Sequence, residues 1–370
     1  MKAIAAVLRE PTGSFTIEEL DVGTANDDEV LVRMVATGVC HTDLLSRDLP
    51  SELFVAPIVF GHEGAGVVEA VGADVTHVAP GDHVVLSYDV CGACPSCVAG
   101  MPYGCYRFNA HNLKNVGFAP GRLDGTSAFT DARGRPVGSH FFGQSSFASH
   151  AVVAGYSAVK VSPDLPLERL GPLGCGIQTG AGAILNTLAV HPGSSVVILG
   201  VGSLGLSAVM AAKLAGASTI VAVDRHVSRL ELAHHYGATH RVTGTPEQVN
   251  AEIFAITGVG ADYVFDTTGS AALVRAAFEA LTFVGSLGMA GVGSPEMTFG
   301  YTSLITGRTV HGVVEGSSRT HEFIPYLAQL NAEGRFPYDE LITYYPLADI
   351  NEAAADSLAG EVIKPVVRFE

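Results

Sequence analysis

Charged residues are scarce in this chain of 370 residues, and basic residues are scarcer than acidic ones. Asp, Glu, Lys and Arg make up 16% of the sequence, with 37 acidic against 21 basic residues and a formal net charge of -16 at pH 7. Binding to a phosphate backbone requires a basic face, and none stands out here, so we expect no nucleic-acid partner. An anionic membrane surface is disfavoured for the same reason.

From the sequence we expect neither an export signal nor a membrane anchor. The short apolar run at the N-terminus is broken by Arg9 and Glu10, which predicts a first strand rather than a signal peptide. Residues 170–212 contain no Asp, Glu, Lys or Arg, but His191, Pro192 and several glycines interrupt them, which argues against a membrane span. We therefore expect a cytoplasmic protein without a membrane partner.

Internal repeats, charge blocks and low-complexity linkers are absent as well. With 48% hydrophobic residues and 43 glycines, the composition is typical of a globular protein with a well-buried core and many tight turns. The length exceeds what a single core usually supports, which predicts two domains.

The two parts of the chain differ in their residue pattern. Up to about residue 172, short β-branched segments alternate with glycine and proline, which predicts a β-rich domain of barrel or sandwich type. Beyond that point, strands, glycine turns and long amphipathic helices alternate, which predicts parallel βαβ units and hence an α/β fold. Near the end, residues 322–336 are typical of a helix and residues 361–369 of a closing strand that can return to the first domain.

A glycine motif in the second part predicts a dinucleotide site. Gly200, Gly202 and Gly205 form Gly-x-Gly-x-x-Gly between a buried strand and a helix that begins at about Ser203. Gly200 permits the turn, Gly202 lets the backbone approach a pyrophosphate, and Gly205 allows close helix packing. The backbone N–H groups of Ser203 and Leu204 at the helix start would then hold the phosphates.

Asp224 predicts which dinucleotide binds. It ends the next strand, nineteen residues beyond Gly205. A carboxylate there accepts hydrogen bonds from the ribose hydroxyls and repels a 2′-phosphate, so NAD is favoured over NADP. Arg225 and Arg229 follow closely and soften that preference, or simply belong to a solvated helix start.

Cysteine is sparse, yet four of the six cysteines fall between residues 91 and 105. Without a targeting segment we expect a reducing compartment, where such clusters are metal sites more often than disulfides. The spacing Cys-x2-Cys-x2-Cys-x7-Cys of Cys91, Cys94, Cys97 and Cys105 suits a closed, structural zinc site. An iron–sulfur run would close with Cys-x3-Cys-Pro, which this sequence does not, and free buried cysteines are the remaining alternative.

Cys40 and Cys175 remain, and each taken singly could be a small buried hydrophobic residue. His62 is the one histidine in an equally distinctive glycine setting, "FGHEGAGVVEAVG". Two thiolates and one imidazole would make the open, three-ligand site of a catalytic zinc.

The segment from Gly61 to Gly72 matches the Gly-His-Glu-x2-Gly-x5-Gly signature of the zinc-dependent medium-chain alcohol dehydrogenases. The chain resembles this family over essentially its whole length, because the four-cysteine lobe and the glycine motif follow in the family's order. The resemblance implies two Zn²⁺ per subunit, NAD as cofactor, and a homodimer or homotetramer. It also implies a GroES-like β-rich catalytic domain, a Rossmann domain with a doubly wound parallel sheet, and a returning C-terminal segment, at residues 1–176 (zinc lobe at about 89–108), 177–314 and 315–370.

The resemblance also assigns roles around the catalytic zinc. Cys40, His62 and Cys175 would be its ligands, and Glu63 a carboxylate near the metal that can exchange with them. Asp43 would orient His62, although it is equally suited to capping a helix start. Thr42 would hydrogen-bond the alcohol and begin its proton path. Many relatives carry a histidine at the position of Leu45, so the end of that path is left open.

For the cofactor, the resemblance places His41 and Lys364 at the pyrophosphate and Thr179 beside the nicotinamide. Family position also predicts a substrate pocket of apolar and aromatic side chains, two of which, Val292 and Val314, would touch the cofactor as well. The predicted pocket residues are Tyr88, Phe141, Phe142, Val292 and Val314. Such a set suits a benzyl ring and offers no charge to an acid or a sugar.

Within the family, "CHTDL", "FFGQSSFASHAVV" and "PLGCGIQTGAGAILN" look most similar to the aryl-alcohol (benzyl-alcohol) dehydrogenases. The sequence therefore predicts reversible, NAD-dependent oxidation of primary aromatic alcohols to aldehydes. Two other enzyme activities stay open, the oxidation of allylic terpenoid alcohols of the geraniol or perillyl type and that of a thiol–formaldehyde adduct. A non-catalytic protein that binds a dinucleotide or is held together by zinc is the third alternative.

Overall fold

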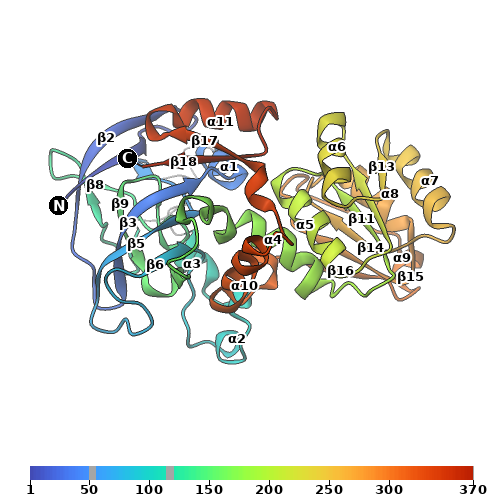
Figure 1. The fold of residues 1–370 in the computed structure, drawn as a ribbon, viewed down its shortest axis with the longest axis horizontal. Coiled ribbons are helices and arrows are strands. Elements are labelled where there is room, and N and C mark those ends of the chain that lie inside the picture. Colours follow the sequence, from blue (N-terminus) through green and yellow to red (C-terminus); the bar gives the residue numbers. More distant parts are fainter. Residues whose placement is uncertain (50–55, 114–120, 370) are drawn as a thin grey trace. The chain divides into compact units, whose positions relative to one another are not determined.

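The computed structural model describes residues 1–49, 56–113 and 121–369. The chain divides into two compact units (Figure 1). The first unit comprises Met1–Cys175, Arg319–Gly334 and Tyr338–Glu370, and the second Gly176–Ser318 with Arg335–Pro337.

The first unit is built on two mainly antiparallel sheets, as alternating β-branched and small residues favour. One sheet has the order β4-β1-β2-β7-β8, and its strands are Lys2–Leu8 (β1), Phe15–Val22 (β2), Ile58–Val59 (β4), Phe129–Thr130 (β7) and Pro136–Val137 (β8). The other has the order β10-β6-β5-β3-β18-β17, with β9 also paired to β3. Its strands are Glu29–Gly38 (β3), Gly64–Val71 (β5), His83–Leu86 (β6), His150–Ala154 (β9), Ala158–Lys160 (β10), Ile342–Pro346 (β17) and Lys364–Arg368 (β18). The apolar faces of the strands bury one continuous core that includes Phe60, Phe129 and Phe147.

The end of the chain belongs to this first unit. Strand β18 pairs with β3 in antiparallel fashion, which places Val366 opposite Gly38. Five α-helices complete the unit over the described residues, namely His41–Arg47 (α1), Pro95–Val98 (α2), Phe108–Asn112 (α3), Thr320–Ala332 (α10) and Ile350–Ala359 (α11). The predicted helix and closing strand near the C-terminus are therefore present.

The second unit is a parallel six-stranded sheet in the order β13-β12-β11-β14-β15-β16 (Figure 1). Its strands are Ser195–Leu199 (β11), Thr219–Val223 (β12), His240–Val242 (β13), Ala261–Asp266 (β14), Leu281–Met289 (β15) and Thr309–Gly312 (β16). Helices connect the strands, as parallel pairing requires. They are Ser203–Leu214 (α5), Val227–Tyr236 (α6), Pro246–Thr257 (α7), Ala271–Glu279 (α8) and Tyr301–Leu304 (α9), while Gly176–Gly182 (α4) precedes β11.

This strand order reverses direction between β11 and β14, and open α/β sheets bind ligands at such a point. The predicted fold class, a GroES-like β-rich domain with a doubly wound parallel-sheet domain, is confirmed. The uncharged residues 170–212 fold into several short elements rather than one long helix. Within the described ranges, no helix is both long enough and apolar enough to cross a bilayer.

Candidate functional site

Three side chains far apart in the sequence, Cys40, His62 and Cys175, meet in the first unit. Their ligand atoms all lie within 4.8 Å of one another. Cys40 is the N-cap residue of α1, His62 lies in the turn between β4 and β5, and Cys175 directly precedes α4. Two thiols and an imidazole around one point form a donor set that takes zinc and leaves a fourth position open.

Asp43 fixes the orientation of the His62 ring. Its Oδ1 lies 2.8 Å from His62 Nδ1, and both side chains are fully buried. The same carboxylate accepts hydrogen bonds from the backbone N–H groups of Cys40 and Gly61, at 2.9 and 3.1 Å. The other ring nitrogen, Nε2, is buried and has no hydrogen-bond partner among the described residues. A histidine held in this way by a carboxylate presents Nε2 as a metal ligand, so the site fits the zinc that the sequence predicts.

The surroundings of Cys40 also suit metal binding. The hydrogen bond with Cys175 lowers the pKa of Cys40 well below that of an ordinary thiol, and the charges of His62 and Lys364 act in the same direction against the effect of burial. Metal-binding cysteines must lose their proton. The thiol of Cys40 therefore loses its proton readily, as binding a metal cation requires.

Gln144, which the sequence analysis did not single out, holds the backbone around His62. Its Nε2 donates to His62 O at 2.9 Å and to Ser87 O at 3.3 Å, while its Oε1 accepts from Gly64 N at 3.1 Å. The side chain is fully buried. Because His62, Gly64 and Ser87 lie 82, 80 and 57 residues before Gln144, no local sequence signal reveals these contacts.

Glu63 and Lys364 form a buried ion pair next to the cysteine and histidine group. Lys364 Nζ lies 2.9 Å from both carboxylate oxygens of Glu63, and neither side chain is more than 2% exposed. Burial by itself lowers the pKa of Lys364, but the attraction of Glu63 outweighs it and the net shift is upward. Lys364, which was predicted to contact the pyrophosphate, is thus paired with Glu63, the carboxylate predicted to lie near the metal.

Aromatic rings surround His62. Phe142 stacks on the imidazole with 4.7 Å between ring centroids, and Phe141 meets it edge-on at 5.6 Å. Phe108 of α3 continues the group, since its ring lies 6.4 Å from that of Phe142 and 5.7 Å from that of the buried Tyr88. Three of the five predicted pocket residues, Tyr88, Phe141 and Phe142, thus lie in one aromatic group beside the metal-binding residues.

The segment that carries these rings has an unusual backbone. His140, Phe142 and Ser145 have φ values of 61°, 51° and 59°, in the left-handed region that non-glycine residues rarely adopt. Hydrogen bonds compensate for this strain, because Ser145 Oγ donates to Val59 O at 2.7 Å and accepts from Phe141 N at 3.0 Å. Strain that is retained in this way is common at functional sites.

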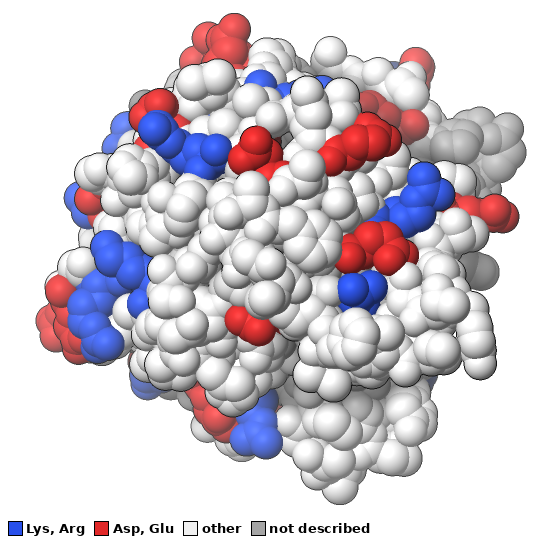
Figure 2. Space-filling view, turned by 90° about the vertical axis from the view of Figure 1, so that its right-hand side faces the viewer, with Lys and Arg blue, Asp and Glu red and all other residues white. Residues whose placement is uncertain are grey.

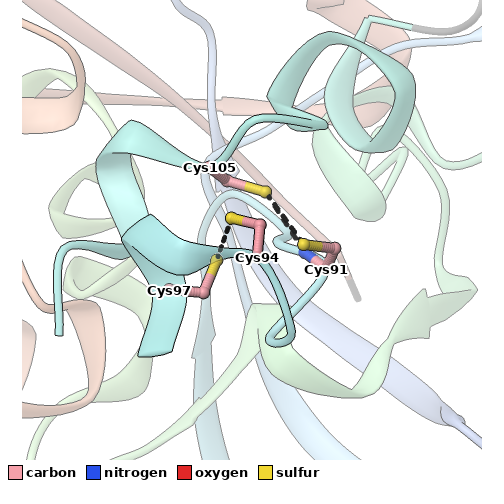
Figure 3. A group of neighbouring side chains, drawn as sticks. All are labelled: Cys91, Cys94, Cys97 and Cys105. Atoms are coloured by element: carbon pink, nitrogen blue, oxygen red, sulfur yellow. Dashed lines mark hydrogen bonds between the residues drawn. The ribbon is translucent and has the colours of Figure 1, made fainter. Parts of the chain in front are cut away.

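The four clustered cysteines form a second group (Figure 3). Cys94 and Cys97 face each other, as do Cys91 and Cys105, each pair with 3.5 Å between the sulfur atoms. The backbone N–H of Tyr106 donates to Cys94 Sγ and that of Cys91 to Cys105 Sγ, both at 3.4 Å, and such hydrogen bonds stabilise thiolates. Four converging sulfurs match a closed tetrahedral zinc site with no position for a substrate.

In the second unit, the glycine motif has the geometry that a dinucleotide loop requires. Gly200 has a φ of 79°, which a side chain would strain, and a Cβ at Gly205 would lie 1.9 Å from Gly200 O. A Cβ at Gly202, by contrast, would meet nothing within 4 Å. Gly202 caps α5, so this open backbone lies at the N-terminus where Ser203 and Leu204 begin the helix. Anions bind at such helix ends.

Asp224 follows β12 and closes this loop from the other side. Its carboxylate accepts hydrogen bonds from Val201 N at 2.8 Å and His226 N at 2.9 Å. On α6, Arg229 is half-buried, and its Nε has no hydrogen-bond partner among the described residues. Asp224 therefore lies next to the glycine loop, and Arg229 lies on α6, the helix that follows Asp224 in the chain.

The other predicted residues occupy both units. At the start of α1, His41 is exposed and Thr42 half-buried, while Leu45, where many relatives have histidine, is 38% exposed. In the second unit, Thr179 is buried on α4. Val292 and Val314, predicted to line the pocket and touch the cofactor, also belong to the second unit, where they are 75% and 43% exposed.

Comparisons with known proteins agree with this architecture. Residues 26–163 match the family model described as alcohol dehydrogenase GroES-like domain, and residues 203–332 match the one described as zinc-binding dehydrogenase. Among curated proteins, the chain is 43% identical to geraniol dehydrogenase from Castellaniella defragrans, with 100% of this chain and 98% of the relative covered. It is 35% identical to S-(hydroxymethyl)glutathione dehydrogenase from Saccharomyces cerevisiae, with 100% and 97% covered.

Solved structures give the same result. An alcohol dehydrogenase zinc-binding domain protein from Burkholderia ambifaria matches with a TM-score of 0.96 and 48% identity, covering 100% of this chain and 99% of that one. Benzyl alcohol dehydrogenase from Acinetobacter calcoaceticus matches with a TM-score of 0.94 and 43% identity, covering 100% of both chains. With the cysteine and histidine group, the four-cysteine cluster and the glycine loop all in place, the chain belongs to the zinc-dependent medium-chain alcohol dehydrogenase family.

Proposed function

We propose that this protein oxidises primary aromatic alcohols of the benzyl type to aldehydes, reversibly, with NAD as the hydride acceptor. The observation that carries the proposal is the stacking of Phe142 on His62 and the edge-on contact of Phe141, which place two aromatic rings against the imidazole that would bind the metal. An aromatic substrate ring gains offset or edge-to-face contacts with such rings. The same surface offers no charge to hold an acid or a sugar.

The chain's own residues have defined tasks in this reaction. When bound, zinc supplies a Lewis acid for the alcohol oxygen and NAD supplies the hydride acceptor. Asp43 keeps the proton of His62 on Nδ1, so that Nε2 stays available to the metal. Thr42 Oγ1, half-buried at the start of α1, accepts the hydroxyl proton of the alcohol and passes it outward. The end of that path stays open, because Leu45 carries no titratable group.

Two features support NAD as the cofactor. Gly202 leaves the N-terminus of α5 open to a pyrophosphate, as nothing lies within 4 Å of a Cβ built there. The Asp224 carboxylate, fixed by two backbone N–H groups, stands where it would accept hydrogen bonds from the adenosine ribose and repel a 2′-phosphate.

Two of the similar proteins support alternative activities. The similarity to a geraniol dehydrogenase supports an allylic terpenoid alcohol as substrate, which a flat apolar site would also accept. The similarity to an S-(hydroxymethyl)glutathione dehydrogenase supports a thiol–formaldehyde adduct. The aromatic group around His62 favours the benzyl alcohols over the charged thiol adduct.

A substrate panel tests the proposal. Purified protein is assayed for NAD and NADP reduction with benzyl alcohol, geraniol and hydroxymethylglutathione, and its zinc content is measured. We expect the highest kcat/KM with benzyl alcohol and NAD, and about two zinc ions per subunit from the two separate sites. Cys40→Ser should lose most of the activity and one of the two zincs. Rates dominated by hydroxymethylglutathione, or full activity in Cys40→Ser, would contradict the proposal.

We further propose that the chain forms a homodimer or homotetramer. Several large apolar side chains of the second unit are exposed, among them Phe283 (72%), Val284 (76%), Tyr301 (77%) and Ile305 (63%). Strand β16 ends the parallel sheet, and such an edge strand is open to pairing. On the side of the molecule drawn in Figure 2, acidic and basic side chains are scattered between areas of uncharged surface, and neither sign forms one large patch. These features support self-association rather than binding to a charged partner.

A further inference from the structure

A carboxylate that the sequence analysis did not single out lies beside Thr179 in the second unit. Glu315 Oε2 accepts hydrogen bonds from Thr179 Oγ1 at 3.5 Å and from Gln178 Nε2 at 3.4 Å. Ser318 Oγ joins the group through Gln178 Oε1 at 2.8 Å and Glu315 O at 2.7 Å. Glu315 is 9% exposed and Gln178 fully buried. Glu315 is therefore a buried acid whose carboxylate is hydrogen-bonded to two side chains of α4.

The backbone holds Glu315 in place at some cost. Glu315, Gly316 and Ser317 have φ values of 47°, 65° and 48°, so three successive residues adopt the left-handed conformation. The turn also packs directly on α4, because a Cβ at Gly182 would lie 2.2 Å from Gly316 O. Non-glycine residues in this conformation persist only where the surrounding structure compensates for the strain. The surrounding structure therefore holds the Glu315 carboxylate in a defined position.

Helix α4 packs against α5, the helix that follows the glycine loop. The chain passes from the predicted zinc ligand Cys175 straight into α4 at Gly176. Further along, a Cβ at Gly180 would lie 2.0 Å from the backbone oxygen of Leu204, a residue at the predicted pyrophosphate site. Thr179, which precedes Gly180, is the residue predicted to lie beside the nicotinamide.

We propose that Glu315 is a positioning and electrostatic residue that favours the oxidised, cationic nicotinamide over the reduced, neutral one. This inference rests on the proposed function, since it requires NAD at the glycine loop with its nicotinamide beside Thr179. The Glu315 carboxylate is only 9% exposed, and charges at buried positions interact more strongly than in water, so it would attract the positive ring of NAD⁺. NADH carries no such charge and gains nothing from it. Glu315 would therefore bias the bound cofactor toward the form that accepts hydride.

Separate dissociation constants for NAD⁺ and NADH test the proposal. They are measured by fluorescence and calorimetry on the zinc-loaded wild type and on Glu315→Gln, which keeps the side-chain volume and removes the charge. We expect the Kd of NAD⁺ to rise about tenfold in Glu315→Gln and that of NADH to change less than about twofold. Glu315→Asp keeps the charge but withdraws it by one methylene, and should give an intermediate NAD⁺ affinity. Glu252→Gln, an exposed acid on α7, serves as the matched control and should leave both constants unchanged.

The possible results distinguish a failure of the Glu315 proposal from a failure of the proposed function. Equal weakening of NAD⁺ and NADH would show that Glu315 only maintains the shape of α4, and no change in either constant would remove any role; both results overturn the proposal. If Glu315→Gln does not fold, as judged by circular dichroism, the decision rests on whether Glu315→Asp weakens NAD⁺ selectively. A wild type that binds neither NAD⁺ nor NADH would instead refute the proposed function itself.

Discussion

At the level of single residues, the candidate metal site depends on side chains that never touch the metal. Asp43 orients His62 through one hydrogen bond and holds the backbone of Cys40 and Gly61 through two more. Gln144 does the same for the backbone on both sides of Glu63. Each is fully buried, so its polar atoms would lose their hydration without a partner. The geometry of the ligands is therefore set by their neighbours as much as by the ligands themselves.

Replacing Gln144 by leucine tests this dependence. The substitution keeps the approximate volume but removes the partners of His62 O and Gly64 N, and buried polar groups left in this state cost about 1–3 kcal/mol each. We expect a loss of about 3 kcal/mol in the free energy of unfolding and about tenfold weaker zinc retention. Urea unfolding and competition with a chelator measure the two effects. Gln329→Leu, on the exposed face of α10, should change neither, and an equally stable Gln144→Leu protein would contradict the argument.

At the level of elements, the sequence predicts best what is encoded locally. Strand β11, the glycine turn and helix α5 follow directly from an apolar run, three spaced glycines and a helical pattern, and α5 begins at the predicted Ser203. Strand β18 was equally recognisable. The turn at residues 140–145 was not, because left-handed backbone at His140 and Phe142 has no sequence signal comparable to glycine.

Long-range contacts explain the rest of what the sequence could not predict. Gln144 and Glu315 are ordinary polar residues in their local context, and only the folded chain brings them to His62 and Thr179. The three ligands Cys40, His62 and Cys175 could be predicted because the chain has only six cysteines and because His62 lies in a distinctive glycine-rich motif. A role could thus be assigned in advance where a residue type or its spacing is unusual.

The glycine loop allows a direct comparison of two similar substitutions. Gly205→Ala would place a methyl group 1.9 Å from Gly200 O, so α5 must move away from the turn, and we expect a loss of about 3 kcal/mol in the stability of the second unit. Gly202→Ala meets nothing within 4 Å, so it should fold as well as the wild type but bind NAD about tenfold more weakly, because the methyl group occupies the approach to the pyrophosphate. Thermal unfolding and NAD titration measure the two properties. A stable Gly205→Ala protein, or unimpaired NAD binding by Gly202→Ala, would show that the glycines do not have these separate roles.

At the level of the whole molecule, distant parts of the first unit are joined by a few buried charges. Lys364, near the C-terminus, reaches Glu63, and Arg122 and His140 both reach Glu29 at the start of β3. These groups are largely removed from water, so each depends on its partner. In a chain with a formal net charge of -16, such pairs also decide how the fold responds to acid.

Glu29 gives this response a definite direction. Burial by itself raises the pKa of Glu29, but hydrogen bonds from His140 and Arg122 outweigh it and hold the pKa at about 2. Arg122 contributes two of these bonds, both at 2.8 Å, and His140 Nε2 lies 3.0 Å from the carboxylate. Because the folded-state pKa lies below the unfolded value near 4.5, the stabilisation is complete above that value and is lost as the pH falls toward 2.

Glu29→Gln should therefore be less stable than the wild type at pH 7 by about 3 kcal/mol, with a difference that shrinks steadily between pH 4.5 and pH 2. Urea unfolding of both proteins at pH 7, 4 and 3 measures this difference. Acid also protonates the zinc-binding thiols, but both proteins share them, so their effect cancels in the comparison. Glu296→Gln, an exposed acid in the second unit, controls for the change in net charge. A stability difference that stays constant down to pH 3 would mean that Glu29 acts through its shape and not through its charge.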